Sequence, residues 1–118
     1  MQYRRLGKSN LRVSALCLGT MMFGDQTDAA ESQRIVDHAR HQGMNFIDTA
    51  DVYSLGKSEE ITGNTIRAER DHWVLATKVG NKMMPDGPFP NHERYSRKWL
   101  MQECDASLKR LSTNYIDI

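Results

Sequence analysis

Short apolar runs alternate with longer amphipathic stretches along the chain, and this alternation predicts the architecture. Four runs have the length and composition of buried strands: residues 15–19, 46–48, 72–78 and 115–118. Three longer stretches between them predict helices: residues 28–42, 58–67 and 96–111. One strand alternating with one helix predicts an α/β protein with a parallel sheet, right-handed crossovers and helices outside it. A doubly wound sheet and a TIM barrel both fit this pattern.

The predicted elements begin and end at turn and cap residues. Residues 3–6 and 11–13 are short alternating runs joined by a turn that contains Gly and Asn, which predicts a β-hairpin over 3–13. Asp28 followed by Glu31 predicts a capping box for the first helix, which ends at Gly43. Ser58 and Ser96 are predicted to cap the second and third helices.

The segment before the third helix differs in composition from the helix itself. Residues 79–95 are rich in Gly, Pro and Asn, which predicts a long irregular loop of the kind that covers an active site. Within the third helix, four apolar residues fall near one face: Trp99, Leu100, Ala106 and Leu108. Such a face is typical of a helix packed against a core.

Two common nucleotide-binding motifs are absent from the sequence. A Rossmann fold requires G-x-G-x-x-G after its first strand, whereas Thr, Met, Met and Phe stand between Gly19 and Gly24. The two Gly-Lys-Ser triplets, at 7–9 and 56–58, lack the first glycine of a P-loop, because Gln2 and Asp51 occupy its position. The absence of both motifs weakens the doubly wound alternative.

Composition narrows the class of protein further. The 118 residues, 39% hydrophobic and 26% charged, are ordinary for one globular domain. A net charge of +1 gives no attraction toward nucleic acid or an anionic membrane, so we expect neither partner. No apolar segment approaches the roughly 20 residues that span a bilayer, and the N-terminus does not resemble a signal peptide. We therefore expect a cytoplasmic protein.

The cysteines and histidines do not predict a metal site. Cys17 and Cys104 are the two cysteines, they lie in a predicted strand and a predicted helix, and their spacing is not C-x-x-C. We expect two buried free thiols. His38 and His41 share one helical face, but no third ligand falls at a recognisable spacing, so we expect no metal.

The candidate catalytic residues lie at or just after the ends of predicted strands. Asp48 follows the second strand, Tyr53 lies on the loop after it, and Lys78 ends the third strand. A phenol has a pKa of about 10, and a neighbouring ammonium lowers it by favouring the phenolate. Asp48 would balance the charge of Lys78, and Tyr53 would then serve as a general acid toward a carbonyl oxygen. Alternatively, Lys78 would be a Schiff-base nucleophile, as in a class I aldolase. Residue types alone do not decide between these readings.

Several segments resemble the signature blocks of the aldo-keto reductase family, in the same order and at fitting spacing. The blocks are residues 46–53 (FIDTADVY), 56–61 (GKSEEI) and 76–80 (ATKVG), with further similarity at 3–9, 13–14, 18–21, 108–111 and 115–118. The resemblance implies a (β/α)8 TIM barrel that reduces an aldehyde or ketone to an alcohol with NADPH. It assigns catalytic roles to Asp48, Tyr53 and Lys78. It also places Gly19, Thr20 and Met21 beside the cofactor's nicotinamide, together with Asp48 and Tyr53.

The resemblance covers only the N-terminal half of such a barrel. The family's fourth catalytic residue is a histidine just beyond the strand that begins at Tyr115, and this position falls after Ile118. We therefore expect residues 1–118 to form the first half of one barrel domain, inactive alone. The remainder of the barrel or a second copy would cover its open sheet. The family also includes potassium-channel β subunits, so a cofactor-bound binding subunit is an alternative function.

Overall fold

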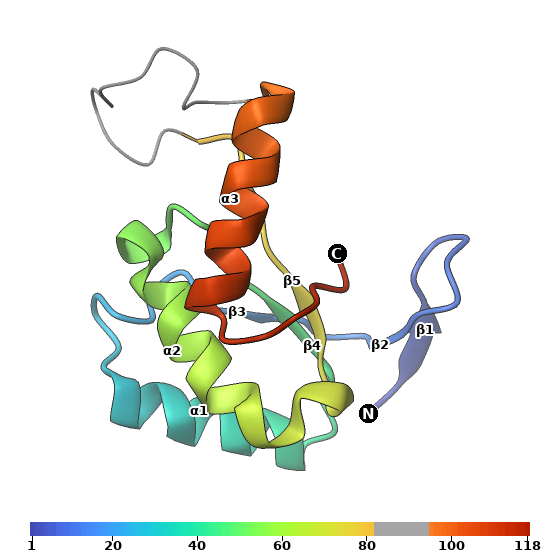
Figure 1. The fold of residues 1–118 in the computed structure, drawn as a ribbon. Helices are drawn as coiled ribbons and strands as arrows, with labels where there is room; N and C mark the ends of the chain where they lie inside the picture. Colours follow the sequence, from blue (N-terminus) through green and yellow to red (C-terminus); the bar gives the residue numbers. More distant parts are fainter. Residues whose placement is uncertain (82–94) are drawn as a thin grey trace.

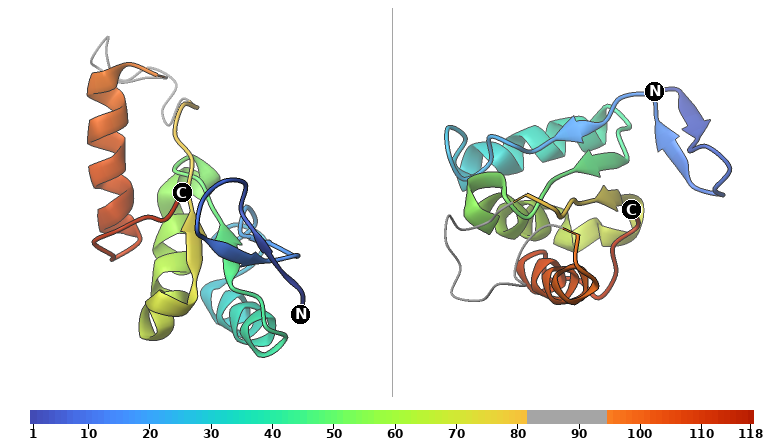
Figure 2. Two further views of the ribbon diagram at one scale, coloured as in Figure 1. Left: turned by 90° about the vertical axis from the view of Figure 1, so that its right-hand side faces the viewer. Right: turned by 90° about the horizontal axis from the view of Figure 1, so that it is seen from above.

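The computed structural model describes residues 1–81 and 95–118. The chain begins with an antiparallel hairpin of β1 (Tyr3–Arg5) and β2 (Arg12–Ser14), in which Arg4 lies opposite Val13. Gly7 takes a positive φ in the turn, a conformation that glycine adopts at little cost. The predicted hairpin is thus confirmed, and Figure 2 shows it at the edge of the molecule in the view from above.

Three parallel strands form the sheet that organises the rest of the chain. They are β3 (Leu18–Gly19), β4 (Phe46–Asp48) and β5 (Val74–Ala76), in that spatial order. Their register places Gly19 beside Asp48 and Asp48 beside Ala76. The carboxyl ends of all three strands therefore meet at one edge of the sheet, as the alternating pattern predicted.

Three α-helices follow one another in chain order beside the strands (Figure 1). They are α1 (Ala29–His41), α2 (Lys57–Ile66) and α3 (Arg97–Arg110), with 3₁₀ turns η1 (Tyr53–Gly56) and η2 (Arg67–His72) at either end of α2. The Asp28 carboxylate accepts a hydrogen bond from the N–H of Glu31 at 2.8 Å, and Ser96 caps α3 in the same way. Asp28 and Ser96 are thus confirmed as caps, whereas the Glu31 carboxylate pairs with Arg34 instead of completing the predicted capping box.

The predicted cap of α2 is wrong. The helix begins at Lys57 after Gly56, which has a φ of 89° and makes no side-chain cap. A side chain at Gly56 would collide with Arg110, whose Cδ would lie 2.7 Å from the new Cβ. Ser58 is the second residue of the helix and is fully buried. Its hydroxyl donates to the Thr20 carbonyl at the end of a strand and does not cap the helix.

The core lies between the sheet and the helices. Ile47 of β4 and Leu75 of β5 are fully buried, and they join seven further buried residues: Phe23, Val36, Ala39, Ile61, Ile66, Trp73 and Leu111. Helix α2 approaches the end of α3 closely at Gly63, where an added Cβ would lie 2.2 Å from the Leu111 carbonyl oxygen. Burial of these side chains is the main stabilising contribution to the fold.

The inward face of α3 is more polar than its sequence pattern predicts. The two buried residues of this helix are Glu103 and Ser107, whereas Trp99 and Leu100 are only partly buried. Arg110, one or two turns further along the helix, donates hydrogen bonds to both Glu103 and Ser107. This pairing allows polar side chains to occupy the buried face without unsatisfied charge.

Both cysteines are free but exposed, which corrects the expectation of buried thiols. Cys17 precedes β3, since that strand begins only at Leu18, and Cys104 lies on the outward face of α3. Partial burial and the nearby charge of Asp48 raise the pKa of the Cys17 thiol to about 11. It is therefore neutral at physiological pH and a poor nucleophile.

The C-terminal segment runs beside β5 without forming the predicted fourth strand (Figure 2). The N–H groups of Asp117 and Ile118 both point to the Leu75 carbonyl oxygen, and Thr77 donates to Ile118 at 3.1 Å. The Asp117 carboxylate accepts from the Leu75 N–H at 2.9 Å, where a regular ladder would use a backbone carbonyl. This side-chain bond accounts for the irregular pairing.

Two further sequence predictions concern the segment before α3 and the histidines of α1. The predicted loop over residues 79–95 lies mostly outside the described residues. His38 and His41 are exposed on α1, and the described ranges contain no cluster of three potential metal ligands. None of the helices within residues 1–81 and 95–118 is long and apolar enough to cross a membrane.

Candidate functional site

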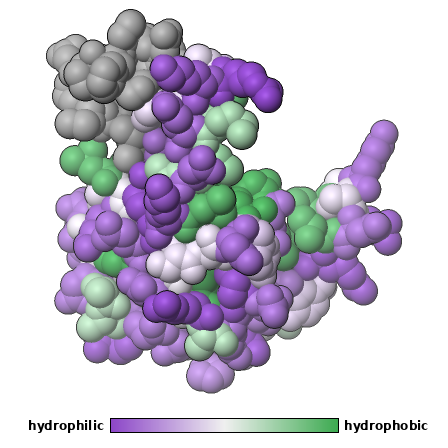
Figure 3. Space-filling model, in the orientation of Figure 1, coloured by the Kyte–Doolittle hydropathy of each residue, from purple (hydrophilic) through white to green (hydrophobic). Residues whose placement is uncertain are grey.

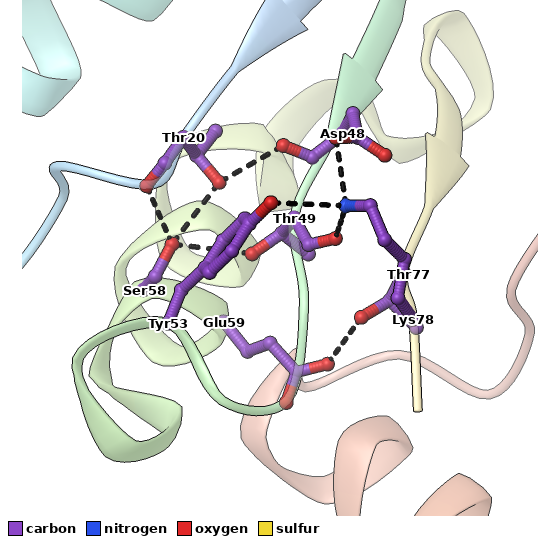
Figure 4. A network of polar contacts seen from close by, with 8 residues as sticks. All are labelled: Thr20, Asp48, Thr49, Tyr53, Ser58, Glu59, Thr77 and Lys78. Carbon is purple, nitrogen blue, oxygen red and sulfur yellow. Dashed lines mark hydrogen bonds and ion pairs between the residues drawn. The ribbon is translucent and has the colours of Figure 1, made fainter. Parts of the chain in front are cut away.

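The predicted acid and base groups meet at the carboxyl edge of the sheet. Asp48 ends β4, and Lys78 follows β5 by two residues, so adjacent parallel strands deliver both side chains to one place. The Lys78 ammonium donates to an Asp48 carboxylate oxygen at 2.8 Å and to the Thr49 carbonyl oxygen at 2.5 Å (Figure 4). These two hydrogen bonds fix the position of the Lys78 ammonium.

Tyr53 brings a phenol to the same ammonium. Its oxygen lies 3.4 Å from the Lys78 Nζ, which in turn lies 4.9 Å from the centre of the ring. After Tyr53 the chain turns sharply through Ser54 and Leu55, whose φ values of 48° and 52° are in the left-handed region. Such a conformation is costly for residues other than glycine, and it is commonly found at functional sites.

The surroundings of Lys78 favour its charged form. Partial burial lowers the pKa of the ammonium, but the hydrogen bonds to Asp48 and Tyr53 and their charges outweigh this effect, so the pKa is raised. The Lys78 side chain is 50% exposed and that of Asp48 is 32% exposed. Lys78 thus stays protonated and holds an ammonium next to the Tyr53 phenol at a partly open edge, where a small molecule can reach it.

The three residues predicted beside the cofactor occupy different positions at this edge. Gly19 ends β3 level with Asp48, and no atom lies within 4 Å of a Cβ added there. Met21 is 58% exposed. Thr20 is fully buried, and its N–H and hydroxyl both lie within hydrogen-bonding distance of the Asp48 carbonyl oxygen. Gly19 and Met21 therefore face open space, whereas Thr20 faces the interior.

An open pocket of about 630 Å³ lies beside the phenol. Met21, Met22 and Leu55 give it an apolar wall, and Tyr53 and Asp25 also line it. An apolar wall next to a phenol and a half-exposed ammonium suits a small ligand with one polar group.

A second set of polar residues lies directly behind this site and was missed in the sequence. The sequence predicts Ser58 as a helix cap, and Glu59 follows it in the first turn of the helix. Glu59 is in fact 0% exposed, accepts from the Thr77 hydroxyl at 2.6 Å and pairs with Arg110 at 2.6 Å. The available signal was a threonine beside each of the three predicted site residues at strand ends, Gly19, Asp48 and Lys78: Thr20, Thr49 and Thr77.

Comparison with known proteins defines the class to which this fold and site belong. The chain matches the family model described as "Aldo/keto reductase family" over residues 15–118. It therefore belongs to the aldo/keto reductase family, as the resemblance of its motifs predicted.

Individual relatives are similar along the whole chain. It is 43% identical to "Probable voltage-gated potassium channel subunit beta" of Arabidopsis thaliana, with 100% of this chain and 36% of that protein covered. It is 40% identical to "Uncharacterized oxidoreductase YrpG" of Bacillus subtilis, with 100% of this chain and 39% of that protein covered. The solved holo form of aldo-keto reductase AKR11C1 from Bacillus halodurans superposes with a TM-score of 0.84 at 36% identity, covering 98% of this chain and 38% of that one. The chain thus spans less than half the length of each of these relatives.

Proposed function

We propose that this chain is part of an oxidoreductase that reduces an aldehyde or ketone to an alcohol with NADPH. The observation that carries the proposal is the position of the Lys78 ammonium, which contacts both Asp48 and Tyr53. A carbonyl oxygen gains negative charge as its carbon is reduced, and it needs a proton at that moment. The Tyr53 phenol is the group placed to donate it.

Each residue of the site has one role in this proposal. Tyr53 donates its proton to the carbonyl oxygen, and Lys78 stabilises the phenolate that remains. Asp48 keeps the ammonium charged and oriented by accepting its hydrogen bond at 2.8 Å. When bound, NADPH supplies the hydride. Gly19 and Met21 would hold the cofactor's nicotinamide together with Asp48 and Tyr53, and buried Thr20 would support this loop from inside.

The Schiff-base alternative fits the site less well. A lysine that attacks a carbonyl must be neutral, which requires a lowered pKa. Here the pKa of Lys78 is raised, and its ammonium is engaged by Asp48, the Thr49 carbonyl and Tyr53. We therefore favour Lys78 as a fixed charge over Lys78 as a nucleophile.

We also propose that residues 1–118 are the N-terminal half of a (β/α)8 barrel. In the described residues, the sheet has three regular strands and an apolar surface lies in the hollow between α3 and the hairpin (Figure 3). Leu16 and Ile118 are exposed apolar residues, 57% and 47% accessible. Further strands of the barrel, or a second copy, would cover such a face. They would also bring the remaining catalytic and cofactor-binding groups.

A second candidate is a cofactor-bound binding subunit, which is favoured by the 43% identity to the Arabidopsis relative named as a channel subunit. One experiment separates the two candidates: NADPH oxidation by the complete polypeptide that carries this chain, measured with a panel of aldehydes and ketones. Turnover that depends on the carbonyl compound supports the enzyme. Tight cofactor binding without turnover on any member of the panel favours the binding subunit.

A further inference from the structure

Three threonines flank the residues of the candidate site. Thr20 lies between Gly19 and Met21, Thr49 follows Asp48, and Thr77 precedes Lys78. Each threonine stands just after the end of a different strand, β3, β4 and β5 respectively. All three hydroxyls turn away from the open edge toward the start of helix α2 (Figure 4).

Ser58 joins the first two strand ends. Its hydroxyl donates to the Thr20 carbonyl oxygen at 2.7 Å and lies 3.0 Å from the Thr20 hydroxyl and 3.1 Å from the Thr49 hydroxyl. A hydroxyl has one proton to donate and two lone pairs, so the proton goes to the carbonyl while the oxygen accepts. One fully buried side chain thus couples the end of β3 to the residue after Asp48.

Glu59, the next residue of α2, joins the third strand end. One carboxylate oxygen accepts from the Thr77 hydroxyl at 2.6 Å, and the other accepts from Arg110 at 2.6 Å. Arg110 also donates to Glu103, so the carboxylate is held from α3 as well. Hydrogen bonds to a charged group are short and strong, and in a buried site they are difficult to replace with water.

We propose that Ser58 and Glu59 are positioning residues of the candidate active site: they hold the ends of β3, β4 and β5 at the separation that lets Lys78 reach both Asp48 and Tyr53. The expected effect on kcat rests on the proposed function, whereas the expected effect on the position of Lys78 does not. Neither side chain touches the open edge, since both are fully buried. They act through the three threonines.

The sharpest test changes Thr77 and leaves Glu59 paired with Arg110. Thr77→Val removes the hydroxyl and keeps the shape, Thr77→Ser restores the hydroxyl, and Thr65→Val is the matched control. Thr65 lies on α2, and within the described residues its hydroxyl donates to the Thr62 carbonyl of its own helix, away from the strand ends. The complete polypeptide is assayed for kcat and KM. The titration of Lys78 is followed separately by pH-dependent acylation and peptide mass spectrometry.

We expect Thr77→Val to lower kcat about 10- to 100-fold, because a displacement of 1 Å at a reacting group has an effect of this size. The pKa of Lys78 should fall, because the displaced ammonium loses its bond to Asp48. Thr77→Ser should recover both values, and Thr65→Val should change neither. Unchanged kcat and unchanged titration in Thr77→Val, with or without a lower unfolding temperature, overturn the proposal.

Two further measurements keep the proposals separate. If Thr77→Val does not fold, Ser58→Ala is measured in the same way, since it cuts the links to Thr20 and Thr49. If the unaltered protein does not oxidise NADPH in the presence of any carbonyl compound of the panel, the proposed function fails. The titration of Lys78 still decides whether Ser58 and Glu59 position it.

Discussion

The Lys78 ammonium lies 2.8 Å from an Asp48 carboxylate oxygen, although 30 residues separate the two in the chain. The contact follows from the register of the sheet, which places Asp48 beside Ala76, two residues before Lys78. The pair is half exposed, so its value for stability is small. Its position next to the Tyr53 phenol indicates a role in chemistry instead.

Replacement of Asp48 should change the titration of that ammonium. Asp48→Asn removes the negative charge that helps to raise the pKa of Lys78, so the pKa should fall. Carbonyl reduction should fall with it, because an incompletely charged or misplaced lysine stabilises the phenolate less well. Acylation of Lys78 as a function of pH measures the first effect. Asp105→Asn, on the exposed face of α3, is the control, and an unchanged titration in Asp48→Asn contradicts the assignment.

Removal of one oxygen from Tyr53 should separate proton donation from binding. Tyr53→Phe keeps the ring over Lys78 and deletes the donor, so kcat should fall about 10²- to 10⁴-fold, the usual contribution of a general acid. Cofactor affinity, measured by fluorescence titration, should change little. Tyr3→Phe removes a phenol that, in the described part of the chain, donates to the Gly43 carbonyl, and it should retain full activity. Normal turnover in Tyr53→Phe would exclude it as the acid.

Asp51 should make the fold less stable as pH rises. Burial, together with the nearby charge of Glu103, raises the pKa of this carboxyl from 3.8 to about 6, although a Val52 N–H bond opposes the shift. Asp51 is 1% exposed, and in the described part of the chain its Oδ2 has no hydrogen-bond partner. The folded state therefore binds the proton more tightly than the unfolded state. The free energy of unfolding falls as the pH rises from about 4 to about 6.

Asp51→Asn should therefore stabilise the protein at pH 7 by about 1 to 3 kcal/mol, since each pKa unit corresponds to about 1.4 kcal/mol. The gain should shrink toward pH 4, where the native carboxyl is largely protonated. Urea unfolding at both pH values measures the difference. A gain of equal size at pH 4 and pH 7 would mean that ionisation of Asp51 is not its cause.

Loss of the Arg110 guanidinium should destabilise the fold strongly. Arg110→Met leaves Glu59 and Glu103 buried without their cation, and removal of one partner from such a group costs about 3 to 5 kcal/mol. Thermal and urea unfolding should both show the loss. Lys109→Met changes the exposed neighbour on α3 and should stay within about 0.5 kcal/mol of the unaltered protein. Equal stability of the two variants would contradict the role given to Arg110.

The sequence predicted the hairpin, three parallel strands, three helices and the caps at Asp28 and Ser96. These features depend on neighbours within a few residues, and local hydrogen bonding and hydrophobic periodicity are sufficient to specify them. It also predicted that Asp48 and Lys78 would lie together, because parallel strands end at the same edge. Their catalytic roles, with that of Tyr53, stay predictions.

Only the tertiary structure revealed the polar layer behind the site. Ser58 and Glu59 have the sequence position of cap residues, yet both are buried, because their partners come from elsewhere in the chain. The Arg110 that pairs with Glu59 lies 51 residues away. The buried face of α3 was mispredicted for the same reason. Which polar residues are buried depends on which distant group is placed to satisfy them, and hydrophobic pattern does not carry that information.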